Sequence, residues 1–271
     1  MNSFLSIIKA SFRKDFLFQL SYRLSFFTEI LFAFLLIIFL FFLSQSFSFS
    51  EESVYKDYKG EFFLFSITGF TVVNLMGQCY ASITNNLREA QSFGFIEELY
   101  VSDNKFLTIF LSACAYTFVK SFTRLVIIFL ISWYLSNQML SIENILFLLA
   151  ICVLSLISFI GIALIGISII LVFKKGDYLS FIFVGGSLIL SGAIYPNDVL
   201  PEYLILFAEV LPLTHTLEII RYEIVEISSE SSPNYPIIKL VALSIFYLLM
   251  GYFLAIKSLR YSREKGSLED Y

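Results

Sequence analysis

The feature that most constrains this chain is a set of six apolar runs, each long enough to cross a bilayer as a helix. A spanning helix needs about 20 mostly apolar residues, since only its own backbone can satisfy its hydrogen bonds inside the membrane. Of the 271 residues, 58% are hydrophobic and 15% are charged. The sequence therefore predicts an all-α membrane protein that forms a single domain over residues 1–271. The six predicted spans are Leu24–Leu43, Phe62–Ile83, Phe106–Leu135, Ile145–Phe173, Tyr178–Tyr195 and Ile237–Ile256.

Composition limits the possible partners and chemistry. The formal net charge is −4, which argues against nucleic acid as a partner. Cys79, Cys114 and Cys152 all lie inside apolar runs, so neither a disulfide framework nor a metal site is predicted. The chain has no G-x-x-x-x-G-K-(S/T) phosphate loop, no H-E-x-x-H pair and no serine–histidine–aspartate set. We therefore expect no catalytic residues and no directly bound cofactor.

Lysine and arginine predict the orientation. With six spans both termini share one side, and basic residues concentrate on the cytoplasmic side of membrane proteins. Twelve of them fall on the side of the termini, namely Lys9, Arg13, Lys14, Arg23, Arg88, Lys105, Lys174, Lys175, Lys257, Arg260, Arg263 and Lys265. Four fall on the other side, namely Lys56, Lys59, Arg221 and Lys239. We therefore predict cytoplasmic termini and a location in the plasma (inner) membrane.

Residues 1–20 predict an amphipathic helix before the first span. Phe4, Ile8, Phe12 and Phe16 recur every four residues, which gives the helix one apolar stripe. Such a helix lies in the cytoplasmic membrane interface with its stripe toward lipid. The alternative is a leader that packs on the protein itself.

Three charged residues inside the apolar runs are candidates for a translocation path. Glu29 lies within the first span, where a carboxylate usually faces a partner or a cavity. Lys120 and Arg124 are four residues apart in the third span and share one helix face. An unpaired charge at the centre of a span costs about 2.5–3.5 kcal/mol. Either the two basic residues meet an anionic substrate or Glu29 in a cavity, or they extend toward the interface.

Residues 85–105, NNLREAQSFGFIEELYVSDNK, form the longest predicted cytoplasmic loop. Its centre, Phe93–Val101, is apolar enough to dock on a partner and polar enough to remain in water. This composition predicts a short surface helix that inserts into a groove on a partner protein.

A proline-broken segment over residues 196–227 lies between the fifth and sixth runs. Pro196 and Pro201 remove backbone donors that a continuing helix would use. The sequence therefore predicts two half-length helices, Glu202–Leu211 and Leu213–Ile227, which enter the membrane from outside and return. Backbone that is not helical is tolerated at membrane depth only where protein buries it or where it lines a cavity. The segment thus predicts a transport or gating element on one face of the membrane.

Thr214 and His215 fall near the turn between these two predicted helices. As the one histidine of the chain, His215 is either a proton switch or a structural side chain with satisfied hydrogen bonds.

The spacing of Ser191-Gly192, Pro196, Leu200-Pro201, Pro212-Leu213-Thr214 and Arg221 resembles the signature of type-2 ABC transporter permeases. These are the membrane subunits of ATP-driven exporters, and the resemblance extends to the number of spans, the leader, the cytoplasmic loop and the hairpin. It implies an extracellular re-entrant hairpin at the outer gate, with gate residues Pro196, Pro201, Pro212, Thr214, His215 and Arg221.

The cytoplasmic loop is similar to the coupling helix of the same family, whose pattern is G-T-(L/I)-E-x-L-x-x-S-P. The chain matches it at Gly94, Ile96, Glu97, Leu99 and Ser102 and departs from it at Phe95 and Asp103. The resemblance implies contact with an ATPase subunit through Phe93, Gly94, Phe95, Ile96, Glu97, Glu98 and Leu99.

The resemblance as a whole implies a permease subunit of an ABC exporter. ATP and Mg²⁺ would be bound by a separate ATPase subunit, and a second copy or a paralogous permease would complete the path. Drugs, lipids, lipid-linked glycans and ions are all substrates of such exporters. The alternative is a stand-alone secondary transporter or channel, in which Glu29 is the candidate ion-binding carboxylate.

Overall fold

The computed structural model describes residues 2–46, 62–94, 112, 115–123, 126–127, 142–173, 177–225 and 234–264. Every regular element within these ranges is a helix, in agreement with the predicted all-α class. The elements are α1 (Asn2–Ser21), α2 (Arg23–Ser46), α3 (Phe62–Ser92), α6 (Ile142–Phe173), α7 (Asp177–Leu190), the 3₁₀ turn η2 (Asn197–Val199), α8 (Glu202–Val210), α9 (Pro212–Val225) and α10 (Asn234–Glu264).

Four predicted spans lie within the long helices α2, α3, α6 and α10. Three stretches in the described residues are long and apolar enough to cross a membrane, namely Phe62–Ser92, Leu146–Phe173 and Asn234–Ser262. The apolar part of α2, Ile30–Gln45, is shorter. The predicted third span, Phe106–Leu135, lies largely outside the described residues. These apolar helices are those of a membrane-embedded protein.

The fifth predicted span, Tyr178–Tyr195, is not one continuous helix. α7 ends at Leu190, and the chain turns through Gly192, whose φ of 75° lies in the left-handed region that glycine adopts readily. The 14 residues of α7 extend about 21 Å, less than the roughly 30 Å bilayer core. Hydropathy extended the span beyond the turn because Ala193 and Ile194 are themselves apolar.

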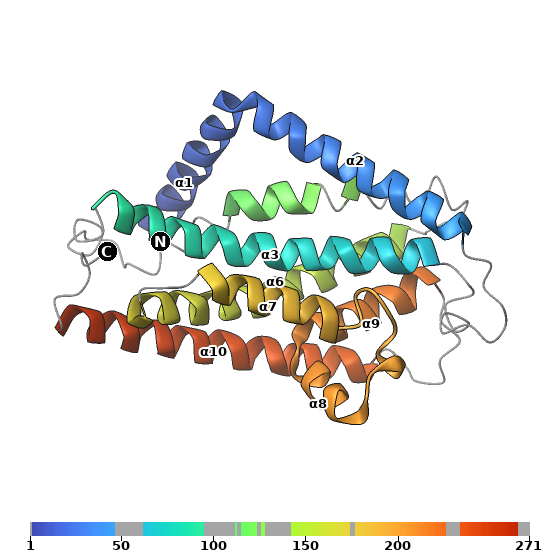
Figure 1. Ribbon diagram of the computed structural model, residues 1–271. Helices are drawn as coiled ribbons and strands as arrows, with labels where there is room; N and C mark the ends of the chain where they lie inside the picture. The colour runs from blue at the N-terminus through green and yellow to red at the C-terminus, as the bar shows by residue number, and fades with distance from the viewer. Residues whose placement is uncertain are drawn as a thin grey trace.

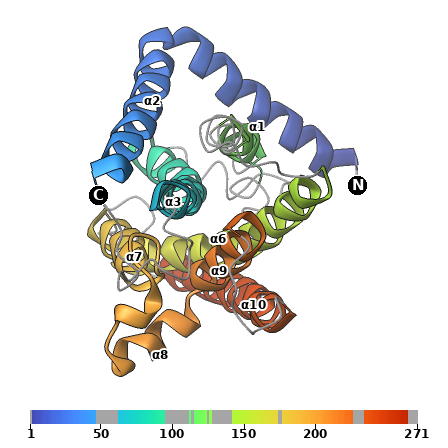
Figure 2. The same cartoon turned by 90° about the vertical axis from the view of Figure 1, so that its right-hand side faces the viewer.

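The helices α3, α6, α7 and α10 run side by side along one direction, with α1 and α2 on one side of them (Figure 1). Figure 2 looks along this bundle and shows α8 projecting from it. α6 contacts both α3 and α10. The α8–α9 segment lies toward the end of the bundle where α3 and α10 begin, and the end of α3 at Ser92 lies at the opposite end.

The backbones of α6 and α10 touch. A Cβ on Gly161 would lie 2.4 Å from the carbonyl carbon of Tyr247, and a Cβ on Gly251 would lie 2.2 Å from the carbonyl oxygen of Gly161. The hydroxyl of Ser262 also donates to the carbonyl of Leu171 at 2.9 Å. Small residues permit such close packing between membrane helices, so glycines set the close approach of α6 and α10.

Candidate functional site

The proline-broken segment forms two short helices that meet at a right angle. α8 and α9 are bent by 90° at Leu211, close to the break that the prolines predict. Pro196 and Pro201 directly precede η2 and α8, with φ values of −58° and −56°. Pro212 is the first residue of α9, where a missing amide hydrogen costs no helical bond. We call α8 and α9 together the outer hairpin.

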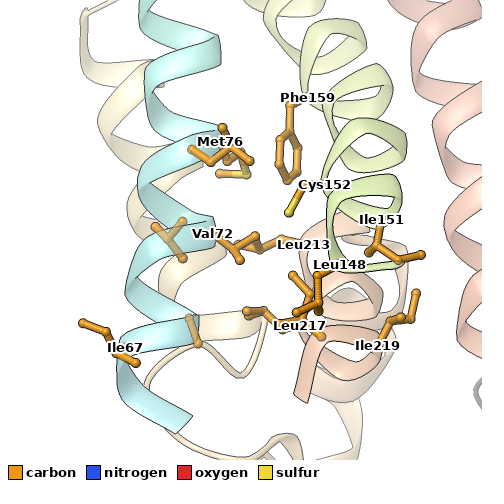
Figure 3. Close-up of a cluster of buried hydrophobic side chains, with 14 of the residues drawn as sticks. Ile67, Val72, Met76, Leu148, Ile151, Cys152, Phe159, Leu213, Leu217 and Ile219 are labelled. Carbon is orange, nitrogen blue, oxygen red and sulfur yellow. The ribbon is translucent and has the colours of Figure 1, made fainter. Parts of the chain in front are cut away.

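α9 packs against α3 and α6 in the buried core. Leu213 and Leu217 are almost fully buried in one apolar cluster with Val72, Met76 and residues of α6. Figure 3 shows Leu213 level with Val72 and Leu217 farther along toward Ile67, so α9 runs antiparallel to α3. Val72 lies about 15 Å along α3 from its first residue, at 1.5 Å per residue. The turn between α8 and α9 therefore lies well inside the length of the bundle.

Side chains cap the end of α8 at this turn, which we call the elbow (Ala208–Pro212). The Ala208 carbonyl accepts the Leu211 amide at 3.0 Å and the Thr214 hydroxyl at 2.7 Å. The Glu209 carbonyl is 2.9 Å from His215 Nε2, and the Val210 carbonyl accepts the Tyr247 hydroxyl at 3.1 Å. A helix end leaves its last four carbonyls without helical partners. Donors from α9 and α10 supply three of them here.

His215 is buried, with 3% of its surface exposed. Because a carbonyl only accepts, the contact with the Glu209 carbonyl requires Nε2 to carry a hydrogen. Nδ1 lies 3.2 Å from Glu218 Oε2, a contact that is a hydrogen bond when one further proton lies between the two atoms. Both ring nitrogens thus have partners, as expected of the structural alternative for this histidine.

Arg221 lies near the other end of α9 and is 3% exposed. Its Nη1 donates to the Gly192 carbonyl at 2.7 Å, and its Nη2 donates to the carbonyls of Ala193 and Phe65, each at 3.1 Å. The guanidinium also lies over the Phe65 ring, with Cζ 3.5 Å from the ring centroid, a favourable cation–π geometry. Arg221 is therefore not an exposed loop charge, because its guanidinium is buried among backbone carbonyls.

Gly69 and Phe65, which the sequence analysis did not select, complete this contact. A Cβ on Gly69 would lie 2.0 Å from the Ala193 carbonyl oxygen and 2.9 Å from Arg221 Nη2. The backbone of α3 therefore touches the turn after α7 directly. A glycine within a helix costs about 1 kcal/mol relative to alanine, so Gly69 inside an apolar run was the available signal of a close approach.

At the opposite end of the bundle, α3 continues to Ser92. The predicted cytoplasmic loop therefore begins later than residue 85, because its first polar residues extend the helix. Gly94 has a φ of 72°, and Phe93 is 77% exposed. The remaining coupling residues, Phe95–Leu99, lie outside the described residues.

α1 packs partly on the protein. The rings of Phe12 and Phe16 contact the ring of Tyr116 at centroid distances of 5.3 and 6.5 Å. Lys14 Nζ donates to Asn86 Oδ1 at 3.2 Å, which joins α1 to the last turns of α3. Phe16 nevertheless remains 46% exposed. The apolar stripe of α1 therefore packs partly on the protein and stays partly exposed, so it has features of both the interfacial helix and the packed leader.

The three candidate path residues are described unequally. Lys120 lies in the helical segment 115–123 and is partly buried. Glu29 lies in α2, but its side chain is outside the described part of the structure, and so is Arg124. A meeting of these three residues therefore stays a prediction.

Comparison with protein families matches residues 3–225 of the chain to the family described as ABC-2 type transporter. The matched range includes all of α1 except its first residue, and the whole outer hairpin. No curated protein matches the chain.

Proposed function

Because the chain belongs to the ABC-2 type transporter family, we propose that it is the transmembrane permease subunit of an ABC-type exporter. The family match over residues 3–225 carries this proposal. The energy comes from a separate ATPase subunit, which binds ATP and Mg²⁺. A second copy of the chain or a paralogous permease completes the substrate path, which includes Glu29, Lys120 and Arg124.

The outer hairpin is the outer gate of this exporter. Three observations support its re-entrant position: α9 runs antiparallel to α3, the elbow lies about 15 Å along α3, and side-chain donors cap the elbow carbonyls. Such caps are required where no water satisfies a helix end. This distance of about 15 Å equals half of the roughly 30 Å bilayer core, which is the depth expected of a hairpin that enters the membrane and returns.

In the topology that we propose, the chain crosses the plasma (inner) membrane six times, with α7 and the turn after it as the fifth crossing, and both termini lie in the cytoplasm. Without Arg221, the outer side keeps Lys56, Lys59 and Lys239 against the twelve basic residues of the inner side, which strengthens the charge bias. Labelling with an impermeant thiol reagent in intact cells tests this topology. A cysteine at Ser231 reacts from outside and one at Ser267 does not, whereas the reverse pattern contradicts the topology.

Coupling to the ATPase runs through residues 85–105. Phe93 is already 77% exposed at the end of α3, and Phe95, Ile96 and Leu99 continue the apolar pattern. These side chains anchor the loop in the ATPase, and Glu97 and Glu98 orient it by pairing with basic groups. Truncating a buried anchor residue typically weakens the binding free energy of an interface by about 2 kcal/mol or more.

The double variant Phe95→Ala with Leu99→Ala tests the proposed function. Two lost anchors weaken the complex by roughly 10³-fold, at 1.4 kcal/mol for each factor of ten. We expect the variant to reach the membrane at a normal level, lose its ATPase during purification and stop exporting. Phe207→Ala is the matched control, because Phe207 is a 64% exposed aromatic residue on the outer hairpin. It should retain the ATPase.

A double variant that still retains its ATPase and exports shows that coupling runs elsewhere, for example through α1. The alternative function gives a different result. A stand-alone secondary transporter, purified without any ATPase and placed in liposomes, transports when a proton or sodium gradient is applied.

A further inference from the structure

The Arg221 contact joins three segments that are distant in the sequence. It ties α9 to Phe65 of α3 and to Gly192 and Ala193 of the turn after α7. We propose that Arg221 is a positioning residue that makes the outer hairpin move together with α3, so that displacement of the cytoplasmic end of α3 reaches the outer gate. This inference rests on the proposed function, which supplies the displacement.

The first argument is that the contact does not separate easily. Arg221 is 3% exposed, so its charge is stabilised by the three carbonyls and the Phe65 ring rather than by water. Pulling α9 away from α3 would take the Phe65 carbonyl and the Phe65 ring away from this buried charge, which is unfavourable. A movement that keeps the contact closed avoids this cost.

The second argument is that the backbone of α3 at Gly69 lies directly against the turn after α7, with no space between them. The Cα of Gly69 approaches the Ala193 carbonyl so closely that a Cβ would lie 2.0 Å from its oxygen. No side chain separates the backbone of α3 from the turn, so a shift of α3 toward the turn displaces the turn directly. Close-packed contacts of this kind transmit strain instead of absorbing it.

The third argument is the contrast with α10. α9 packs against α6 and α10 through apolar residues such as Leu217, Ile220 and Leu240, and apolar contact is non-directional. Among the described residues, single bonds from Lys239 to Glu209 and from Tyr247 to Val210 link the hairpin to α10, and both links are partly exposed, whereas the Arg221 link to α3 is buried. Helices can slide along such surfaces in shear motions. The hairpin therefore follows α3 when α3 moves relative to α10.

The fourth argument is the continuity of α3. Its 31 residues from Phe62 to Ser92 form one helix without a proline, about 46 Å long at 1.5 Å per residue. Sharp kinks almost always need a proline or another identifiable break. The helix thus connects the start of the coupling loop to the Arg221 contact as one rod.

The test uses the full chain in complex with the ATPase that co-purifies with it, in lipid nanodiscs. Cys79, Cys114 and Cys152 are replaced by alanine, and one cysteine is introduced per protein. Ser92→Cys is the α3 probe, and Tyr203→Cys, at a position where the tyrosine is 65% exposed on α8, is the hairpin probe. A maleimide reports the labelling rate of each probe with ADP and in the vanadate-trapped ATP state.

In the otherwise unchanged chain, the labelling rates of both probes should differ between the two states. For each probe we take the ratio of its labelling rate with ADP to its rate in the vanadate-trapped ATP state. In Arg221→Gln, this ratio should become one at the hairpin probe and stay unchanged at the α3 probe. Lys239→Gln is the control, because it removes a polar link from the hairpin to α10 but none to α3. It should leave both ratios unchanged.

Gly69→Ala is a second variant that keeps every charge and forces α3 away from the Ala193 carbonyl. It should reduce the ratio at the hairpin probe, whereas Gly77→Ala, whose Cβ meets Val184 Cγ1 at 3.6 Å, should not. If Arg221→Gln keeps the full ratio at the hairpin probe, the inference is wrong. It is also wrong if Arg221→Gln and Gly69→Ala both fail to accumulate while both controls do, since the contact then serves folding.

The failure of the proposed function looks different. If no ATPase co-purifies, or if the α3 probe of the otherwise unchanged chain does not respond to the nucleotide state, the proposed function and this inference are both wrong. If the α3 probe responds and the hairpin probe of Arg221→Gln also responds, the inference alone is wrong.

Discussion

Tyr247→Phe measures whether the elbow of the outer hairpin lies at membrane depth. The Tyr247 hydroxyl donates to the Val210 carbonyl at 3.1 Å, and the substitution removes only this oxygen. If lipid and protein surround the elbow, the carbonyl is left without a donor at a cost of about 1–3 kcal/mol. If water reaches the elbow, water replaces the hydroxyl and the effect stays within about 0.5 kcal/mol, as for most surface substitutions.

Hydrogen exchange of the purified chain in lipid nanodiscs provides the measurement. At 1.4 kcal/mol for each factor of ten, a loss of 1–3 kcal/mol speeds the exchange of α8 and α9 amides by roughly 5- to 150-fold. Tyr252→Phe is the matched control, because Tyr252 lies on the same helix and is 49% exposed. It should leave exchange in the hairpin unchanged.

Thr214→Val provides an internal comparison at the same elbow. Ala208 loses the Thr214 hydroxyl but keeps the Leu211 amide at 3.0 Å, so its carbonyl is not orphaned. We therefore expect a smaller acceleration than with Tyr247→Phe. An unchanged exchange rate in Tyr247→Phe would refute the re-entrant placement, because a carbonyl that loses its donor at no cost is hydrated.

Two further predictions concern the bundle and the path. Gly161→Ala forces α6 from the Tyr247 backbone and should cost about 1–3 kcal/mol in thermal unfolding, whereas Gly186→Ala, with no atom within 4 Å of its Cβ, should be neutral or stabilising. Lys120→Met should abolish export at normal membrane level if Lys120 meets substrate, and should spare or improve insertion if it only extends to the interface. Unchanged export in both Lys120→Met and Arg124→Met excludes the pair from the mechanism.

Hydropathy predicted where the long helices lie in the sequence better than it predicted the residues at which they end. The apolar runs locate α2, α3, α6 and α10 because burial in lipid selects residues strongly and over long stretches. The end of α3 at Ser92 was missed because polar residues continue the helix past the end of its apolar run, where hydropathy gives no signal. The end of α7 was missed for the opposite reason, since the apolar Ala193 and Ile194 follow a turn whose signal is Gly192.

The prolines predicted the break in the hairpin, but the sequence could not show what holds the hairpin in place. Arg221 binds carbonyls that are 28, 29 and 156 residues away, and a backbone carbonyl carries no sequence signature. The same holds for Tyr247, which caps a carbonyl 37 residues away. Only the fold reveals these partners, because every residue offers the same acceptor.

The buried polar side chains of the outer hairpin serve the backbone before they can serve a substrate. Thr214, His215 and Arg221 all contact backbone carbonyls, and together with Tyr247 they satisfy groups that a bent chain exposes. Opening a gate by breaking these bonds would cost about 1–3 kcal/mol for each orphaned group, and more for the buried guanidinium. Moving the hairpin with its bonds to α3 intact keeps the bonds of Thr214, His215 and Arg221 and gives up the Tyr247 bond from α10. If the hairpin is the proposed gate, these costs favour a hairpin that moves as a unit over one that unfolds at its elbow.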